Sequence, residues 1–303
     1  MSYSRTKSLK IRLDILSFLK ALFNLMKPRV MSLVIFTCVV GLLISPKEVN
    51  YLNAIFSIIA VALGSGSAGA LNMWYESELD SIMTRTCLRP IPTGKVTRNQ
   101  ALIFGVLTSV LSIIMLYYFS NLVATLILLS TILFYVFVYT MWLKPKTSQN
   151  IVIGGAAGAL PPVIGWSIAT GSVTFEPIIL FLIIFMWTPS HFWALSIYKT
   201  EDYKNAKIPM LPVTSGIKFT KINIFIYALL LLATIITPFF LNYFGLFYFL
   251  VSGILGVYYV YICYKLLKTS NQRKEKKVAK NIFTFSILFL FLTFVSILVD
   301  SLL

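Results

Sequence analysis

Two groups of acidic residues border long apolar segments, and they are the first candidates for chemistry in this sequence. Only ten residues are Asp or Glu, and five of them fall in these two places. The first group holds Glu76, Glu78 and Asp80, and the second holds Glu201 and Asp202. Acidic side chains next to a membrane are costly unless they are paired or bind a metal. Both groups are therefore candidate functional sites.

The first group extends a regular spacing that begins at Asn72. Asn72, Glu76 and Asp80 are four residues apart, and four residues of a helix turn by about 400°. The three side chains therefore share one helix face over about 12 Å. Oxygen ligands suit Mg²⁺, which usually binds few carboxylates together with substrate phosphate oxygens. We expect these residues to be catalytic Mg²⁺ ligands. The alternative is a solvated helix end.

A basic loop follows the first group. Arg85, Arg89, Lys95 and Arg98 lie within it. The guanidinium of arginine matches the geometry of phosphate oxygens, and a diphosphate beside the acidic face would lie near this loop. We expect Arg85 and Arg89 to bind that diphosphate. On their own, these residues could also serve only to orient the chain in a membrane.

The second group lies after a segment that holds the only histidine of the chain, His191. On a continuous helix, His191, Tyr198 and Asp202 share a face within about 20°. We expect Asp202 to be a further Mg²⁺ ligand that faces the first group. Lys199 stands beside the shared face, and a catalytic or ligand-contacting role is one interpretation of His191. A lone histidine in an apolar helix is more often a hydrogen-bonded structural residue.

Long apolar helices must position these groups. Of 303 residues, 58% are hydrophobic and 12% charged, whereas soluble domains are about 25% charged. Helices need about 20 apolar residues to cross a membrane, and the apolar runs do not alternate as strands would. We predict an all-α polytopic membrane protein. Its nine predicted transmembrane helices are roughly Val30–Ile44, Leu52–Trp74, Ala101–Tyr118, Leu122–Leu143, Ile151–Ser172, Ile178–Ile197, Ile222–Leu241, Tyr243–Tyr264 and Ile282–Val299.

Small residues are concentrated in the second and fifth of these helices, which predicts close packing between backbones. They are Gly64, Gly66 and Gly69 in the second helix and Gly154, Gly155, Gly158 and Gly165 in the fifth. Pro161 and Pro162 predict a kink in the fifth helix.

The basic residues predict the orientation of the helices. The net charge is +16, and only Lys47 of the 26 Lys and Arg residues lies outside the N-terminal arm and the loops after even-numbered helices. By the positive-inside rule, this bias predicts a cytoplasmic N-terminus. It also predicts attraction to anionic lipid. Because the charges are dispersed along short loops, we do not expect nucleic acid to bind.

Residues 1–27 are expected to be a cytoplasmic amphipathic arm, and residues 28–303 the transmembrane domain. The arm is basic, with Arg5, Lys10 and Arg12 among apolar residues, and it lacks the core of a signal peptide. A mitochondrial transit peptide is less favoured, because the stretch is short and contains Asp14. We therefore expect the cell (plasma) membrane of a prokaryote rather than the mitochondrial inner membrane.

A set of motifs runs along nearly the whole chain from Lys27 onward. They are Lys27-Pro-Arg-Val30, Asn72 with Glu76 and Asp80, Met83-Thr-Arg85-Thr86 with Arg89-Pro90, Leu160-Pro-Pro-Val-Ile-Gly-Trp166, Trp187-Thr-Pro-Ser-His-Phe-Trp-Ala194, and Asp202-Tyr203 with Ile208-Pro-Met-Leu-Pro212. In these motifs the chain resembles the protoheme IX farnesyltransferases (haem O synthases), a branch of the UbiA-type intramembrane prenyltransferases. Two positions differ: Glu76 replaces the usual Asp, and Ser190 replaces a common Pro.

The resemblance implies helices around a central cavity that opens to the cytoplasmic side. It implies transfer of a farnesyl group from farnesyl diphosphate to a vinyl group of protoheme IX (haem B), which gives haem O for terminal oxidases. The expected partners are these two substrates, membrane lipid and enzymes of later haem steps. The residue roles it implies are Mg²⁺ binding by Asn72, Glu76, Asp80 and Asp202, diphosphate binding by Arg85, Arg89 and Lys199, and haem or substrate contact by His191, Tyr198 and Tyr203.

Two alternatives remain from the residues alone. A related prenyltransferase could act on an aromatic quinone precursor. A transporter, which belongs to a different class, would carry polar residues at mid-membrane depth along a pathway. Here the charges gather at one face, which favours an enzyme that works at that interface.

Overall fold

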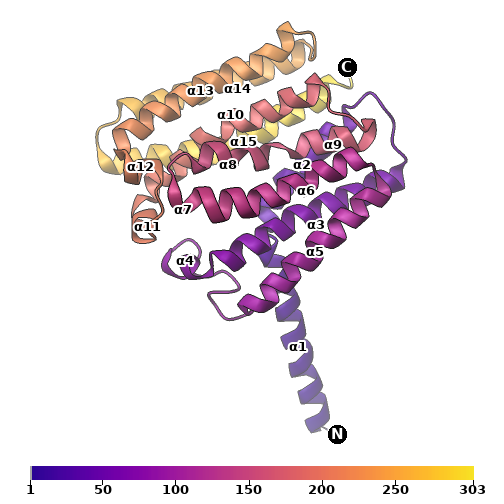
Figure 1. The fold of residues 1–303 in the computed structure, drawn as a ribbon. Coiled ribbons are helices and arrows are strands. Elements are labelled where there is room, and N and C mark those ends of the chain that lie inside the picture. Colours follow the sequence, from indigo (N-terminus) through magenta and orange to yellow (C-terminus); the bar gives the residue numbers. More distant parts are fainter. Residues whose placement is uncertain (1) are drawn as a thin grey trace.

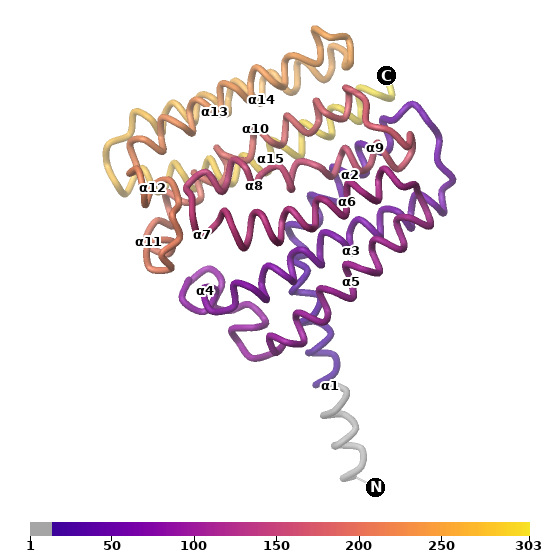
Figure 2. The backbone as a smooth tube through the Cα atoms, in the orientation of Figure 1, coloured from indigo at the N-terminus to yellow at the C-terminus, as the bar shows by residue number. Residues whose placement is uncertain are grey.

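Every regular element in residues 2–303 is a helix (Figure 1). The computed structural model describes the backbone of these residues and the side chains of residues 14–303. The basic residues from Arg5 to Arg12 lie outside the described side chains. The long helices run side by side, with the helices of the C-terminal third stacked on one side of the bundle (Figure 2). The all-α prediction is confirmed.

Eight helical segments in the described residues are long and apolar enough to cross a membrane. Each corresponds to one of the predicted helices from the second onward. They are α3 (Tyr51–Tyr75), α5 (Arg98–Phe119), α6 with η1 and α7 (Leu122–Lys146), α8 with α9 (Asn150–Thr170), α10 (Phe175–Tyr198), α13 (Gly216–Phe240), α14 (Leu246–Lys268) and α15 (Gln272–Asp300).

The first predicted helix differs from the others. It appears as α2 (Pro28–Leu43), which has only 16 residues. It reaches membrane-spanning length only together with the second half of α1 (Ser2–Leu25), and the two helices meet at a bend of 53°. Pro28 starts α2 because its ring fits the first turn of a helix, where its missing N–H leaves no hydrogen bond unmade. The described residues therefore hold eight candidate spans, or nine if this bent pair is one span.

The end of α1 packs against the bundle. Ala21 and Leu25 are buried in a cluster with Met73, Val96 and Ala101. These partners lie on α3, on the loop after it and on α5. The second half of the predicted arm is thus attached to the helices that carry the first acidic group.

The predicted kink in the fifth helix is present. α8 (Asn150–Ala159) ends just before Pro161, and α9 (Pro161–Thr170) begins there. α9 crosses α2 very closely, since a Cβ atom added at Gly165 would overlap the carbonyl oxygen of Cys38. Glycine at this position allows the two backbones to touch.

The fourth span changes its helical geometry part-way. α6 (Leu122–Leu133) is an α-helix, and η1 (Phe134–Leu143) continues it as a π-helix. The Thr140 hydroxyl donates to the carbonyl oxygen of Tyr135, at a distance of 2.8 Å. Such π segments are rare and often occur at functional sites. The short α7 (Lys144–Lys146) completes the span.

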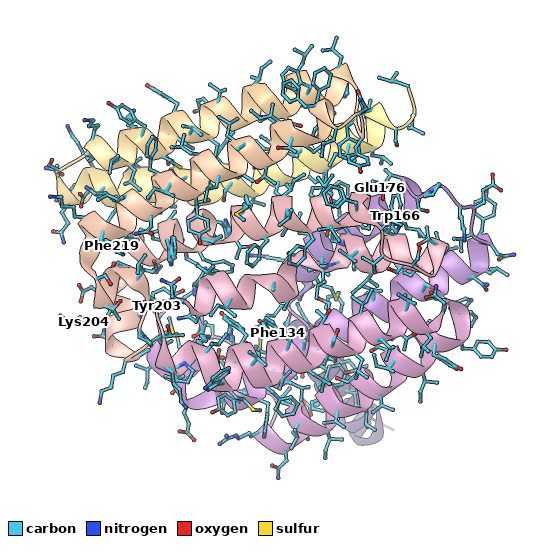
Figure 3. The ribbon with its side chains drawn as sticks, turned by 45° about the horizontal axis from the view of Figure 1, so that its top comes forward. Phe134, Trp166, Glu176, Tyr203, Lys204 and Phe219 are labelled. Carbon is cyan, nitrogen blue, oxygen red and sulfur yellow. The ribbon has the colours of Figure 1, made fainter. Side chains whose placement is uncertain are left out.

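Short helices and loops lie at the end of the bundle where both acidic groups are found. They are α4 (Ser77–Ile82), α11 (Thr200–Asn205) and α12 (Leu211–Thr214). Figure 3 shows Tyr203 and Lys204 at this end and Trp166 and Glu176 at the opposite end. The spans thus bring residues far apart in sequence to one end of the molecule.

Reporter fusions test the predicted orientation. We expect the N-terminus and the loop between Arg273 and Lys277 to be cytoplasmic, and the end after Leu303 to lie on the other side, because the basic residues follow the positive-inside rule. A reporter that works only in the cytoplasm should be active at the first two places and inactive at the third. An inactive N-terminal fusion beside an active loop fusion would mean that α1 and α2 do not form a span.

Candidate active site

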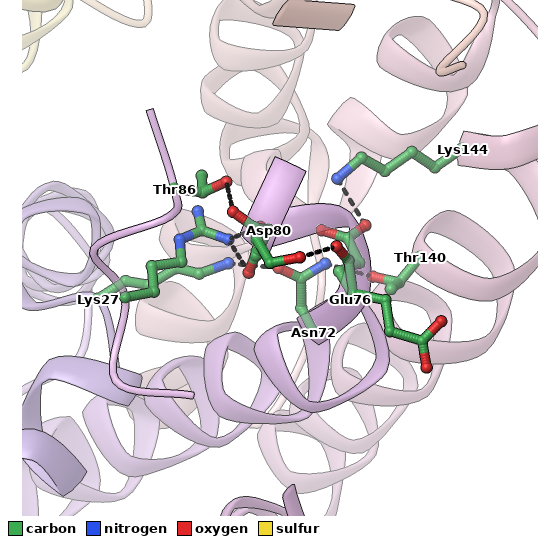
Figure 4. A network of polar contacts seen from close by, with 10 residues as sticks. Lys27, Asn72, Glu76, Asp80, Thr86, Thr140 and Lys144 are labelled. Atoms are coloured by element: carbon green, nitrogen blue, oxygen red, sulfur yellow. Dashed lines mark hydrogen bonds and ion pairs between the residues drawn. The ribbon is translucent and has the colours of Figure 1, made fainter. Parts of the chain in front are cut away.

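Asn72, Glu76 and Asp80 share one face, as their spacing predicts (Figure 4). The helix is interrupted at Glu76, where α3 ends and α4 begins. The four-residue hydrogen bonding nevertheless continues, from Glu76 N to Asn72 O at 2.9 Å and from Asp80 N to Glu76 O at 2.8 Å. All three residues are buried. Buried carboxylates need partners, and the surrounding helices supply them.

Each of the three side chains is paired with a basic residue from a different part of the chain (Figure 4). The pairs are Lys27 Nζ to Asn72 Oδ1 at 2.6 Å, Lys144 Nζ to Glu76 Oε1 at 2.5 Å, and Arg89 Nη1 to Asp80 Oδ1 and Oδ2 at 2.8 and 2.7 Å. The predicted loop residue Arg89 therefore does fold back onto the acidic face. We call these six residues the acid–base network.

The sequence reasoning missed Lys27 and Lys144 as members of the site. Lys27 appeared only in a motif, and Lys144 only as one of many basic loop residues. Lys27 has φ 55° and ψ 59°, a left-handed conformation that is uncommon for residues other than glycine. Backbone strain of this kind concentrates at functional sites. The signals that could have identified them are a lysine directly before the helix-starting Pro28 and a lysine that ends an apolar run.

The positive charges keep Glu76 ionised. Burial alone would raise the pKa of its carboxyl, but the charge and hydrogen bond of Lys144, together with Lys27 and Arg89, leave the pKa below its usual value. The Glu76 carboxylate forms its ion pair with Lys144, which lies 68 residues away in sequence.

Asn72 is held from both ends of its amide. Its Nδ2 donates to the hydroxyl of Thr140 at 3.1 Å, while its Oδ1 accepts from Lys27. Thr140 belongs to η1, so the π-helix directly orients one residue of the acidic face. The amide oxygen is thereby turned toward the cations.

The second acidic group is joined to the first through Thr84. The Thr84 hydroxyl lies 2.8 and 2.7 Å from the two carboxylate oxygens of Asp202, and Lys199 Nζ lies 3.6 Å from one of them. Thr84 comes soon after Asp80 in the loop that also carries Arg85 and Arg89. The sequence reasoning did not single out Thr84. Its contact places Asp202 against this loop, 118 residues away in sequence.

The continuous helix expected from His191 to Asp202 is not present. α10 ends at Tyr198, and α11 starts at Thr200 after Lys199 adopts a non-helical conformation. Asp202 therefore lies on a different helix from His191 and Tyr198. The prediction of a continuous helix was wrong, and the break has no strong local signal.

His191 lies inside the interface between α10 and α15. Its ring stacks between Trp187 and Phe283, at centroid distances of 4.2 and 4.6 Å. Its Nδ1 is 2.6 Å from the hydroxyl of Ser286. These contacts are those of a packed, hydrogen-bonded structural residue, the alternative that the sequence left open.

The remaining predicted site residues differ in exposure. Tyr203 is buried in the main core, and Tyr198 is half-buried with its ring edge against Phe283. Arg85 is exposed and makes no ion pair with any described residue. Its guanidinium is therefore not committed to a carboxylate of the described residues.

The side-chain oxygens of the site suit Mg²⁺ if phosphate oxygens and water complete its coordination. Among the described side chains, no group of three or more His, Cys, Asp or Glu residues could hold a metal ion by itself. Carboxylate and amide oxygens of Asn72, Glu76, Asp80 and Asp202 are nevertheless the ligand type that Mg²⁺ prefers. The arrangement suits an ion that takes few protein ligands and completes its shell with phosphate oxygens and water.

An apolar cavity adjoins the acid–base network. It lies between α2, α3, α6 and the α8–α9 span, and its lining includes Lys27, Gly69, Val61, Leu128 and Ile164. Lys27 belongs both to the cavity wall and to the network. The cavity therefore begins at the polar face and extends into the bundle.

Comparison with known proteins adds to this geometry. The UbiA prenyltransferase family matches residues 34–296 of the chain. The chain belongs to this family. A protoheme IX farnesyltransferase of Pelagibacter ubique (strain HTCC1062) is 61% identical over 282 residues, which are 93% of each chain. Protoheme IX farnesyltransferase 2 of Mesorhizobium japonicum is 49% identical and covers 92% of this chain and 89% of its own.

Solved structures of UbiA-type proteins share the fold. A structure described for digeranylgeranylglyceryl phosphate synthase has a TM-score of 0.77 at 20% identity, covering 94% of this chain and 98% of its own. A UbiA homologue from Archaeoglobus fulgidus bound to GPP and Mg²⁺ has a TM-score of 0.65 at 17% identity, covering 91% and 99%. In this UbiA member, the acid–base network and the cavity lie within the matched region, apart from Lys27 and the cavity-lining residues Met26, Val30 and Met31.

Proposed function

We propose that this UbiA prenyltransferase transfers a farnesyl group from farnesyl diphosphate to a vinyl group of protoheme IX, giving haem O and diphosphate. The observation that carries the proposal is that an apolar cavity begins at Lys27, within a buried network of acids and cations. A prenyl diphosphate has a charged head and an apolar chain, which match these two regions. The names of the relatives, at up to 61% identity, support haem as the acceptor.

The basic residues hold the leaving group. Lys27, Arg89 and Lys144 contact the acidic face. Arg85 is exposed on the loop that follows it, and Lys199 lies 3.6 Å from Asp202. When the bond between the first farnesyl carbon and oxygen breaks, its electron pair leaves with the diphosphate. Fixed cations stabilise that charge as it develops, which is often the largest contribution to catalysis. Mg²⁺, held by Asn72, Glu76, Asp80 and Asp202, would supply further charge neutralisation.

The farnesyl cation then reacts with the acceptor. The π electrons of the haem vinyl group form the new carbon–carbon bond. Water adds to the resulting cation and loses a proton, which gives the hydroxyethylfarnesyl product. The apolar cavity walls keep other water away from the cation until the vinyl group reacts.

The protein acts within a membrane. Its spans and its bacterial relatives fit the plasma membrane of a prokaryote, with the site facing the cytoplasm. The substrates are farnesyl diphosphate and protoheme IX, and enzymes of later haem steps are natural partners because they would consume the product.

Purified protein in lipid vesicles tests the proposal. With Mg²⁺ and farnesyl diphosphate, haem B should be converted into farnesylated haem, detected by mass, with one diphosphate released per product. An aromatic quinone precursor offered under the same conditions should remain unprenylated. Prenylation of that precursor in place of haem would overturn the acceptor assignment, and absence of both products would overturn the proposed activity.

A further inference from the structure

Gly158 stands beside free space, unlike a neighbouring glycine of the same helix. A Cβ atom added at Gly158 would meet no heavy atom within 4 Å, whereas one at Gly155 would lie 2.8 Å from the Thr188 side chain. Helix packing thus accounts for glycine at position 155 but not at position 158. The space at Gly158 belongs to the apolar cavity, whose wall it forms.

Of the α3 residues that line the cavity, Val61 is the farthest along the helix from Asn72. It belongs to one buried cluster with two other lining residues, Leu128 and Ile164, and we call these three the floor. Val61 precedes Asn72 by eleven residues of α3, so the distance from the polar face to the floor is about 16 Å. Gly158 lies on α8, which begins beside the polar face after Lys144–Lys146, whereas Ile164 lies beyond the break on α9, so Gly158 is nearer the polar face. A chain must pass Gly158 to reach the floor.

The distance from the polar face to the floor corresponds to a definite length of prenyl chain. Three bonds of a fully extended peptide chain advance at most about 3.6 Å. At the same advance per bond, three isoprene units, with twelve main-chain carbons, span about 14 Å, and four units span about 19 Å. The first length fits above the floor, and the second does not.

We propose that Gly158 and the floor residue Leu128 set the chain length that this enzyme accepts, at three isoprene units. This inference rests on the proposed function. Gly158 leaves room for the outer units to pass, and Leu128 stops a fourth. The Leu128 side chain lines the cavity and packs against α3, since it would lie 3.0 Å from a Cβ atom added at Gly64. Small residues of α3, such as Ala68, also line the cavity.

Binding of unreactive prenyl thiodiphosphates tests this proposal. Dissociation constants are measured in Mg²⁺ for the dimethylallyl, farnesyl and geranylgeranyl compounds. Gly158→Leu should weaken farnesyl binding about ten- to a hundredfold relative to dimethylallyl binding, because the added side chain fills the passage. Leu128→Ala should improve geranylgeranyl binding about tenfold relative to farnesyl binding.

Gly253→Leu is the matched control. Gly253 is also helical with open space around it, but it does not line the cavity. The ratios between its dissociation constants for the three thiodiphosphates should equal those of the unmodified protein. Unchanged ratios in Gly158→Leu would overturn the inference, and if that variant does not fold, unchanged ratios in Leu128→Ala would do so. Haem farnesylation by the unmodified protein is measured separately, so failure of the proposed function is distinguishable.

Discussion

Asp80→Asn is expected to abolish haem farnesylation while the protein stays folded in the membrane. The carboxylate of Asp80 is buried and accepts two hydrogen bonds from Nη1 of Arg89. Asparagine has nearly the same size but lacks the negative charge that would bind Mg²⁺ and hold Arg89. Loss of one preorganised electrostatic contact typically costs about a hundred- to a thousandfold in rate. The rate of farnesylated haem formation in Mg²⁺ measures the effect.

Glu78→Gln is the matched control for this prediction. Glu78 lies on the same short helix and also carries a negative charge, but its side chain is 88% exposed and forms only a surface pair with Arg98, at 3.3 Å. Ion pairs between exposed side chains contribute little to stability, so this variant should stay folded and retain nearly normal turnover. Near-normal turnover in Asp80→Asn, or equal losses in the two variants, would remove Asp80 from the site.

Arg89→Ala should impair diphosphate handling more than haem handling. Arg89 Nη1 is bound to Asp80, and the fork of its guanidinium leaves further N–H groups for phosphate oxygens. A charge-assisted hydrogen bond contributes about 1.5–3 kcal/mol, so kcat and the affinity for farnesyl diphosphate should fall about ten- to a hundredfold. Initial rates at varied concentrations of each substrate separate the two effects, since the KM for haem should change little.

Two further variants sharpen this test. Arg89→Lys keeps the charge without the planar fork and should recover only part of the lost rate. Arg98→Ala removes a nearby arginine of the same loop region, whose side chain is 48% exposed, and should have little effect. A protein with Arg89→Ala that binds farnesyl diphosphate normally but fails to bind haem would show that Arg89 serves the other substrate.

The sequence was most informative where one local pattern decides the structure. Apolar runs of membrane-spanning length predicted eight of the observed spans, because backbone groups in lipid must be satisfied within a helix. The four-residue spacing of Asn72, Glu76 and Asp80 predicted their shared face, although the helix is interrupted at Glu76. Pro161 predicted the break between α8 and α9 because proline cannot continue the hydrogen bonding of a helix interior.

It was least informative where distant segments meet. Lys27 and Asn72 are 45 residues apart, Lys144 and Glu76 are 68 apart, and neither pairing has a local pattern. The break at Lys199 was also missed, since no proline or glycine marks it. Tertiary packing decides these features, so a single sequence does not reveal them.

The π-helix of the fourth span also limits which changes in length the chain tolerates. A π-helix holds more residues in each turn than an α-helix does. The number of residues in η1 therefore sets the directions in which the side chains of Thr140 and Lys144 point. Deleting one residue within Phe134–Leu143 would rotate everything after it by roughly a quarter turn relative to what precedes it. Lys144 would then point away from Glu76. Insertions and deletions should therefore be excluded from this stretch, where residue number is as constrained as residue identity.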